Sequence, residues 1–128
     1  MKAPRFLSVE VVLQLHEEAI ARFGGSSGFR NETGFASAVV QAQQVYYYQK
    51  TSLFEIAAVY AFHLAEAQAF VDGNKRTAVA AALVFLECNG YQLTGNSMKL
   101  YDAMIAIAKK QIGKPELAQL LEDLTSPI

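Results

Sequence analysis

The sequence predicts an all-α fold, and three observations lead to this prediction. Apolar residues recur at helical spacing along nearly the whole chain. Turns that contain glycine, asparagine or proline separate segments of helical length. The segment Leu53–Ala67 is apolar on almost every side, which indicates a central helix surrounded by others. With 128 residues, of which 52% are apolar and 18% charged, we expect a single domain over residues 1–128.

The first two predicted helices flank a connector rich in glycine and serine. Ser8 is suited to cap a first helix that runs to about Phe23, where a Gly-Gly pair ends it. Residues 26–34 predict an exposed loop or a small hairpin. A short helix is expected from Phe35 to about Gln44, followed by an irregular link. This link contains Tyr46–Tyr48, which we expect to be half-buried.

The third and fourth predicted helices form the centre of the fold. Ser52 and Glu55 have the spacing of a capping box, so the third helix is expected to begin at Leu53 and to reach Ala67. The fourth helix is expected from about Lys75 to Cys88, ending at Asn89-Gly90.

The C-terminal part predicts a brief extended piece and two more helices. The extended piece is Tyr91–Thr94. Ser97 is expected to cap a fifth helix that runs to about Lys110, and Pro115 to open a last helix that ends near Leu124. The residues of the fifth helix expected to be buried are Leu100, Met104, Ile105 and Ile107. The total is about six helices.

The turn between the two central helices is strongly polar. Asp72, Gly73, Asn74, Lys75 and Arg76 occupy consecutive positions there. The first N–H groups of the following helix have no partner inside it and carry the positive end of the helix dipole. The glycine permits close approach of a ligand, the cations add charge, and the carboxylate could hold Mg²⁺ together with phosphate oxygens. These residues predict a site for the phosphates of a nucleotide.

Other interpretations of this turn are open. Asp72-Gly73 could be an ordinary turn with Asn74 as a helix N-cap. Arg76 could form a salt bridge with Glu66. A P-loop is excluded, because the Gly-x-x-x-x-Gly-Lys-Ser/Thr pattern is missing and the turn follows a helix.

The motif Phe70-x-Asp72-x-Asn74-Lys75-Arg76 resembles the signature of the Fic/Doc family in its Doc (death-on-curing) form. That signature reads His-x-Phe-x-Asp-x-Asn-Lys-Arg, with Lys where most Fic proteins have Gly. The similarity extends over most of the chain. The other segments that fit are Leu15-His16, Gly24-Gly25, Gly28–Glu32, Ser52–Glu55, Leu83–Leu86 and Asn89-Gly90.

The resemblance implies the Fic fold, with a flap near residues 25–34 and the motif between the two central helices. It implies ATP and Mg²⁺ as ligands, and transfer of a phosphoryl or AMP group to a hydroxyl of a protein, which for Doc is elongation factor Tu. It also implies a toxin neutralised in trans by a Phd-like antitoxin. The implied roles are metal ligand for Asp72, anion hole for Asn74 and the N–H groups that follow it, phosphate clamps for Lys75 and Arg76, and packing anchor for Phe70. Gly73 completes the set of phosphate-binding residues.

One departure from the family pattern affects catalysis. Gln68 stands where the family has its catalytic histidine. A glutamine amide accepts a hydrogen bond but has no useful basicity near neutral pH. We therefore expect nucleotide binding to be retained and turnover to be reduced by roughly 10²–10⁴-fold. The alternative is a pseudoenzyme that binds nucleotide or antitoxin without catalysis. An inactivating change in a cloned gene and natural divergence both stay open as origins of Gln68, although Ala69, where relatives often have Pro, favours divergence.

Neither histidine of the chain replaces the missing base. His63 lies five residues before Gln68, roughly 140° further round a helix. We expect it to be a core histidine bonded to backbone or to a carboxylate, and His16 to face the core side of the first helix.

Composition limits the remaining functions. A net charge of −1 gives no positive surface for nucleic acid, and a single cysteine suits a reducing cytoplasm. The apolar segment Leu53–Val71 contains four polar side chains, so we expect a core helix and no membrane span. The inhibitory motif Ser/Thr-x-x-x-Glu-Gly/Asn of many Fic proteins is missing, since Ile56 follows Thr51–Glu55. A plain helical interaction domain is the remaining alternative.

Overall fold

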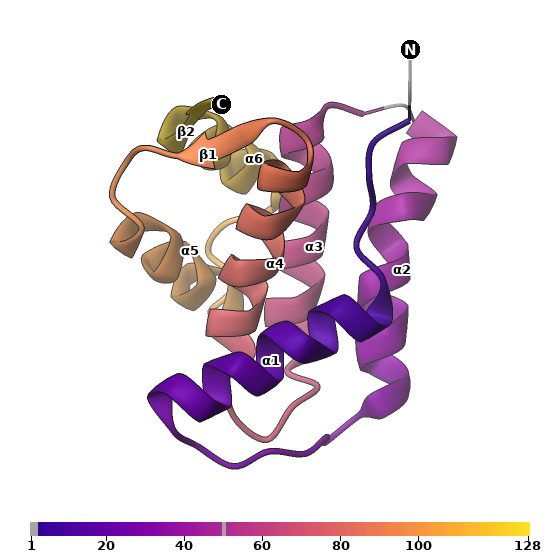
Figure 1. The fold of residues 1–128 in the computed structure, drawn as a ribbon, viewed down its shortest axis with the longest axis vertical. Coiled ribbons are helices and arrows are strands. Elements are labelled where there is room, and N and C mark those ends of the chain that lie inside the picture. The colour runs from indigo at the N-terminus through magenta and orange to yellow at the C-terminus, as the bar shows by residue number, and fades with distance from the viewer. Residues whose placement is uncertain (1–2, 50) are drawn as a thin grey trace.

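The computed structural model describes residues 3–49 and 51–128, and its arrangement is shown in Figure 1. The all-α prediction is confirmed, with the addition of one short antiparallel pair of strands. The elements in chain order are α1 (Val9–Phe23), α2 (Glu32–Gln49), α3 (Leu53–Ala67), α4 (Asn74–Cys88), β1 (Tyr91–Leu93), α5 (Met98–Ala108), α6 (Lys114–Leu124) and β2 (Thr125–Pro127).

Helix α3 is the centre of the fold, as expected. It packs against α2, α4, α5 and α6, and α1 crosses the lower part of α4 in Figure 1. Small side chains permit close approach of α3 and α4, because alanine occupies buried positions on both helices. These alanines are Ala57, Ala58, Ala61 and Ala65 of α3, and Ala78, Ala81 and Ala82 of α4. The turn that joins the two helices is therefore fixed by a rigid helix pair.

Local capping explains the ends of α1 and the start of α3. The Ser8 hydroxyl accepts a hydrogen bond from the Val11 N–H at 3.1 Å. Gly24, with φ of 85°, ends α1 and donates its N–H to the Ile20 carbonyl. The capping box of Ser52 and Glu55 is formed in both directions. These boundaries confirm the sequence predictions.

Helix α2 is longer at both ends than predicted. Asn31 caps its start. The Asn31 side-chain oxygen accepts a hydrogen bond from the Gly34 N–H at 2.9 Å, and its carbonyl accepts one from the Phe35 N–H at 3.0 Å. The predicted irregular link Tyr46–Tyr48 is wrong, since these residues are helical. Phe6 packs on Tyr46 and Tyr47, with ring centroids 5.7 and 6.2 Å away. This contact with a distant segment stabilises the end of the helix. Tyr46 is half-buried as expected, but the same prediction is wrong for Tyr47 and Tyr48, which are 60% and 86% exposed.

Two details of α5 differ from the predictions. Ser97 makes no capping hydrogen bond, and the Asn96 side chain accepts from the Met98 N–H at 2.9 Å instead. Ile105 is 42% exposed. Its neighbour Met104 is buried, and one residue along a helix turns the side chain by about 100°, out of the buried stripe.

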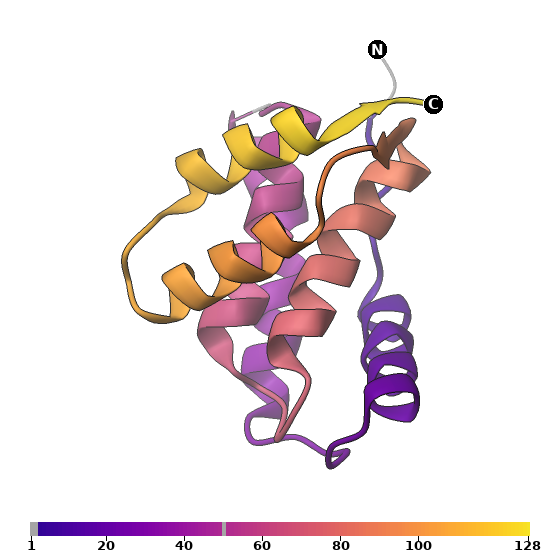
Figure 2. The ribbon, with the colours of Figure 1, turned by 90° about the vertical axis from the view of Figure 1, so that its left-hand side faces the viewer.

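The last strand was not predicted. β2 pairs antiparallel with β1, with Gln92 opposite Ser126. The partners are far apart in sequence, and three residues are too few to show a strand pattern. Figure 2 shows the pair at the end of the helix bundle opposite the α3–α4 turn. In the described ranges, no helix combines the length and the apolar character needed to span a bilayer.

Candidate functional site

The turn between α3 and α4 is closed by Asn74. The side-chain oxygen of Asn74 accepts from the Phe70 N–H at 3.0 Å, and its amide nitrogen donates to the Phe70 carbonyl at 3.0 Å. Asn74 is therefore not the N-cap of α4; that position belongs to Gly73, which has φ of 82°. The alternative interpretation of Asn74 as an ordinary N-cap is wrong.

No side chain caps the start of α4 within the described part of the chain. The N–H groups of its first turn are consequently open to a ligand, and they carry the positive end of the helix dipole. This geometry suits an anion.

The connector between α1 and α2 lies beside the α3–α4 turn (Figure 1 and Figure 2). The N–H groups of Arg30 and Asn31 donate to the Ala69 carbonyl at 2.7 and 3.0 Å, and Val71 N–H donates to the Gly28 carbonyl at 3.1 Å. Phe29 and Phe70 form a single antiparallel bridge. The flap is thus a loop paired to the turn, and the described residues form no hairpin there.

Asp72 is held at two points. Its carbonyl accepts from His16 Nε2 at 2.8 Å, and its Oδ2 accepts from the Ser26 N–H at 2.7 Å. Its other carboxylate oxygen, Oδ1, receives no hydrogen bond from the described residues, so it remains open to a cation. One carboxylate combined with phosphate oxygens is a common way to bind Mg²⁺. Asp72 therefore fits the proposed metal ligand. The structure describes no group of three or more His, Cys, Asp or Glu side chains that could hold a metal on its own.

Two glycines permit the close packing around Asp72. Gly25 has φ of 110°, and a Cβ there would lie 3.0 Å from the Asp72 Cβ. A Cβ on Gly73 would lie 3.3 Å from His16 Cδ2. Any larger residue at these positions would strain the backbone and press on the turn.

Phe70 lies in an aromatic cluster beneath the turn. It is 2% exposed. Its ring stacks on His16 at 3.6 Å between centroids, with an angle of 6° between the planes. Phe29 and Phe35 lie 5.1 and 5.0 Å away. These contacts join α1, the flap and α2 to the motif.

The motif side chains surround one pocket with a volume of about 560 Å³. Three cations, Arg30, Lys75 and Arg76, line it together with one carboxylate, Asp72. The other lining residues are Ala19, Phe23, Gly24, Gly25, Ala65, Gln68, Val71, Gly73 and Asn74. The excess of positive charge at a helix N-terminus suits a ligand with several negative charges.

Arg76 lies at the rim of this pocket and contacts an aromatic ring. Its guanidinium carbon lies 3.9 Å from the centre of the Phe23 ring. The structure records no ion pair between Arg76 and Glu66 among the residues it describes, so this alternative finds no support. A smaller hollow, of about 240 Å³, lies between α1 and α4; Arg76 and Phe23 line it as well, and it continues to Val79 and Leu83.

Gln68 follows the last residue of α3 and has a left-handed backbone, with φ of 45° and ψ of 47°. Such a conformation is uncommon for a residue other than glycine and is found often at functional sites. The side chain is exposed and lines the pocket. Its amide can accept a hydrogen bond but cannot act as a base.

Two contributors to the site were missed in the sequence. Arg30 and His16 both belong to segments that match the family, but Arg30 was not predicted as a pocket cation, and His16 was predicted to face the core and not to contact the motif. A lone arginine in a loop rich in glycine and serine was the signal for Arg30. His16 gave no local signal, because its partner Asp72 is 56 residues away.

His63 is remote from this pocket and its predicted partner is wrong. Lys114 Nζ donates to His63 Nε2 at 3.4 Å, in place of backbone or a carboxylate. Burial lowers the pKa of His63, and the charge of Lys114 lowers it further, against the opposing effect of Glu66. Neutral imidazole is the form that accepts this hydrogen bond.

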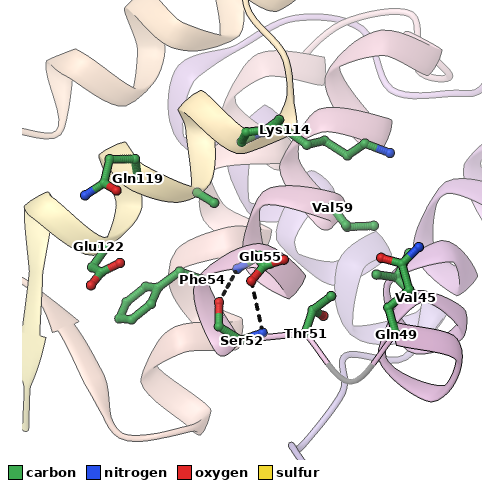
Figure 3. Close-up of a pocket in the computed structure, with 12 residues that line it drawn as sticks. Val45, Gln49, Thr51, Ser52, Phe54, Glu55, Val59, Lys114, Gln119 and Glu122 are labelled. Atoms are coloured by element: carbon green, nitrogen blue, oxygen red, sulfur yellow. Dashed lines mark hydrogen bonds between the residues drawn. The ribbon is translucent and has the colours of Figure 1, made fainter.

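A second pocket, of about 450 Å³, lies at the opposite end of α3, between α2 and α6 (Figure 3). Val45, Phe54 and Val59 line it together with polar side chains such as Gln49 and Glu122. The hydrogen bonds of the Ser52–Glu55 capping box lie at its edge (Figure 3). None of the residues predicted for the phosphate site belongs to it.

The fold and the first pocket define an all-α protein with a pocket lined by three cations at an interhelical turn, beside a loop paired to that turn. The model of the Fic/DOC family matches residues 6–86 of this sequence. The chain belongs to that family, as the motif predicted.

Two curated relatives align with the chain. The protein named "Protein kinase doc" of Escherichia phage P1 is 37% identical over 122 residues, covering 94% of this chain and 95% of the relative. "Toxin Doc" of Mycolicibacterium smegmatis is 41% identical over 78 residues, covering 58% of each chain. Both relatives carry the name Doc, which agrees with the Doc form of the family that Lys75 of the motif indicated.

Proposed function

We propose that the protein is a Doc-like toxin that binds Mg²⁺ and ATP at the α3–α4 turn and transfers a phosphoryl or AMP group to a hydroxyl of a protein. The observation that carries this proposal is the pocket at the open N-terminus of α4, where three cations and one carboxylate meet. The names of the two relatives, a kinase and a toxin, support the same function.

In this proposal the residues of the turn bind and orient the polyphosphate. The open N–H groups of α4 and the cations Lys75 and Arg76 bind phosphate oxygens, which offsets negative charge during transfer. Asp72 would hold Mg²⁺ through Oδ1, and the bound ion would neutralise part of the phosphate charge. Asn74 keeps the turn closed through Phe70 and so aims the N–H groups. The anion-hole role of Asn74 is thereby proposed for its backbone and not for its amide.

Gln68 limits the chemistry. A hydroxyl that attacks phosphorus forms an O–P bond, loses its proton and releases ADP or pyrophosphate. Glutamine can orient the hydroxyl but cannot take up that proton. We therefore expect transfer to be slower by roughly 10²–10⁴-fold than with histidine at position 68.

The proposed partners follow the family. The substrate is a host protein, elongation factor Tu by resemblance, and the neutralising partner is a Phd-like antitoxin acting in trans. The apolar hollow between α1 and α4 supports this arrangement, because an antitoxin segment folded there would contact Arg76 and Phe23 at the rim of the phosphate pocket.

Restoring the base tests this function. Gln68→His should make expression toxic and should produce ATP-dependent labelling of a host protein in a lysate. Label from γ-³²P-ATP would indicate phosphoryl transfer, and label from α-³²P-ATP would indicate AMP transfer. Gln68→Asn, which introduces no base, and Gln68→His combined with Asp72→Asn are the controls, and both should stay inactive.

The second candidate is a pseudoenzyme that binds nucleotide or antitoxin. The observation in its favour is Gln68 itself, an amide at the position of the base. If Gln68→His binds nucleotide but labels no protein and stays harmless, this second function replaces the first.

A further inference from the structure

His16 is a buried polar side chain whose only hydrogen bond in the described structure goes to the motif. It lies in the middle of α1 and is 2% exposed. Its Nε2 lies 2.8 Å from the Asp72 carbonyl. A carbonyl oxygen only accepts, so Nε2 must carry the hydrogen. A buried polar group without a partner is costly, and here the partner is the backbone of the residue that bears the pocket carboxylate.

His16 contacts three residues of the turn. Its ring stacks on Phe70, its Nε2 binds Asp72, and its Cδ2 would lie 3.3 Å from a Cβ at position 73, which glycine leaves out. A packing role alone would be met by an apolar ring, which needs no hydrogen-bond partner. The imidazole adds one directional bond that fixes the peptide plane of Asp72.

The carboxylate of Asp72 is fixed separately by the flap. Ser26 N–H holds Oδ2, while His16 holds the carbonyl. Because the backbone carbonyl and one carboxylate oxygen of Asp72 are both hydrogen-bonded, rotation of its side chain is restricted and Oδ1 is held in one orientation. Preorganisation of this kind lowers the entropy lost when a cation binds.

We infer that His16 is a positioning residue, which holds the Asp72 backbone so that its carboxylate is ready to bind the Mg²⁺ of the nucleotide complex. This inference rests on the proposed function. It concerns the magnesium-dependent part of nucleotide affinity, because Lys75, Arg76 and the N–H groups of α4 bind phosphates without the metal.

Calorimetry with a non-hydrolysable ATP analogue, with and without Mg²⁺, distinguishes the effect of the Nε2–H hydrogen bond of His16 from the effect of its ring stacking on Phe70. His16→Phe keeps the stack on Phe70 and removes the donor. His16→Gln places an amide N–H near the position of Nε2 and should rescue the bond. We expect His16→Phe to lose about tenfold in affinity with Mg²⁺ and less than about twofold without it. His16→Gln should stay within about threefold of the wild type in both conditions.

Ile20→Val is the matched control, since the Ile20 side chain packs on Gly25 and Gly73 from the same helix and has no hydrogen-bonding group. Its magnesium dependence should equal that of the wild type. Equal losses with and without Mg²⁺ for His16→Phe, or no rescue by His16→Gln, would overturn the inference and leave the proposed function intact. Absence of nucleotide binding by the wild type under both conditions would instead overturn the proposed function.

Long-range ¹H–¹⁵N NMR of the wild-type imidazole gives a second measurement that needs no variant and no ligand. We expect the hydrogen of neutral His16 on Nε2. Observation of the Nδ1–H tautomer would exclude the bond to Asp72 and with it the positioning role, even if His16→Phe fails to fold.

Discussion

Asn74 and Phe70 exchange two hydrogen bonds, each 3.0 Å long, between one side-chain amide and one residue of backbone. This pair closes the α3–α4 turn into a ring of five residues and sets the direction of the first N–H groups of α4. A carboxylate could serve the acceptor half of the pair but not the donor half. The side-chain amide of Asn74 is therefore needed to close the turn, in addition to being part of the family motif.

Asn74→Asp should lower the free energy of unfolding by about 1–3 kcal/mol, because it places a carboxylate oxygen against the Phe70 carbonyl. Urea denaturation measures the change. Asn96→Asp is the matched control, since Asn96 uses only its oxygen to cap α5 and aspartate caps equally well. Equal stability of the two variants would contradict the two-bond closure of the turn.

Gln68→Gly should raise the free energy of unfolding by about 1 kcal/mol, because it relieves a left-handed backbone that L-residues adopt at a cost. Thermal or urea unfolding measures it. Lys110, with φ of 60°, is the second non-glycine residue of this kind in the described chain, and Lys110→Gly should give a similar gain far from the pocket. A loss of stability on Gln68→Gly would show that the glutamine side chain stabilises the fold.

Phe23→Leu should weaken binding of an ATP analogue by about two- to fivefold, because leucine keeps the apolar contact and loses the aromatic face beneath the Arg76 guanidinium. Arg76→Ala should weaken it more, since a charge is lost as well. Arg5→Ala changes the net charge equally outside the pocket and serves as the control. Unchanged affinity on Arg76→Ala would mean that this arginine is structural.

Tyr60→Phe should lower stability at neutral pH by about 1–2 kcal/mol, because the hydroxyl accepts from the buried Leu7 N–H at 2.8 Å. Burial raises the pKa of Tyr60 to about 12, against the opposing effect of the hydrogen bond to Leu7. The folded state thus binds this proton more tightly than the unfolded chain, whose tyrosine pKa is about 10. The contribution of this pKa difference to the free energy of unfolding is fully present below pH 10 and is lost as the pH rises towards 12.

Denaturation from pH 8 upward measures this dependence. Tyr60→Phe should show a smaller alkaline loss than the wild type. The exposed Tyr48 gives the control, since Tyr48→Phe should leave the profile unchanged. Identical profiles for the wild type and Tyr60→Phe would contradict the raised pKa.

Local signals in the sequence were sufficient for much of the helical framework. Ser8, the Gly-Gly pair after Phe23, and the spacing of Ser52 and Glu55 mark boundaries through bonds to their near neighbours. The polar turn was equally local, since its five residues, 72–76, follow one another in the sequence.

Features that depend on distant contacts could not be predicted in this way. The end of α2 is stabilised by Phe6, about forty residues earlier, against Tyr46 and Tyr47. The strand β2 depends on β1, and the contact of His16 with Asp72 depends on how α1 crosses the helix pair. For the same reason Arg30 could not be assigned to the pocket, because the pairing of the flap to Ala69 brings it there.

Calorimetric titration of the wild-type protein with a non-hydrolysable ATP analogue, with and without Mg²⁺, tests the central claim most directly. We expect one nucleotide per chain, bound more tightly with Mg²⁺, and we expect Asp72→Asn to abolish the difference while keeping an acceptor for the Ser26 N–H. Absence of binding at millimolar nucleotide, or binding that is unaffected by both Mg²⁺ and Asp72→Asn, would contradict a metal–polyphosphate site at the start of α4.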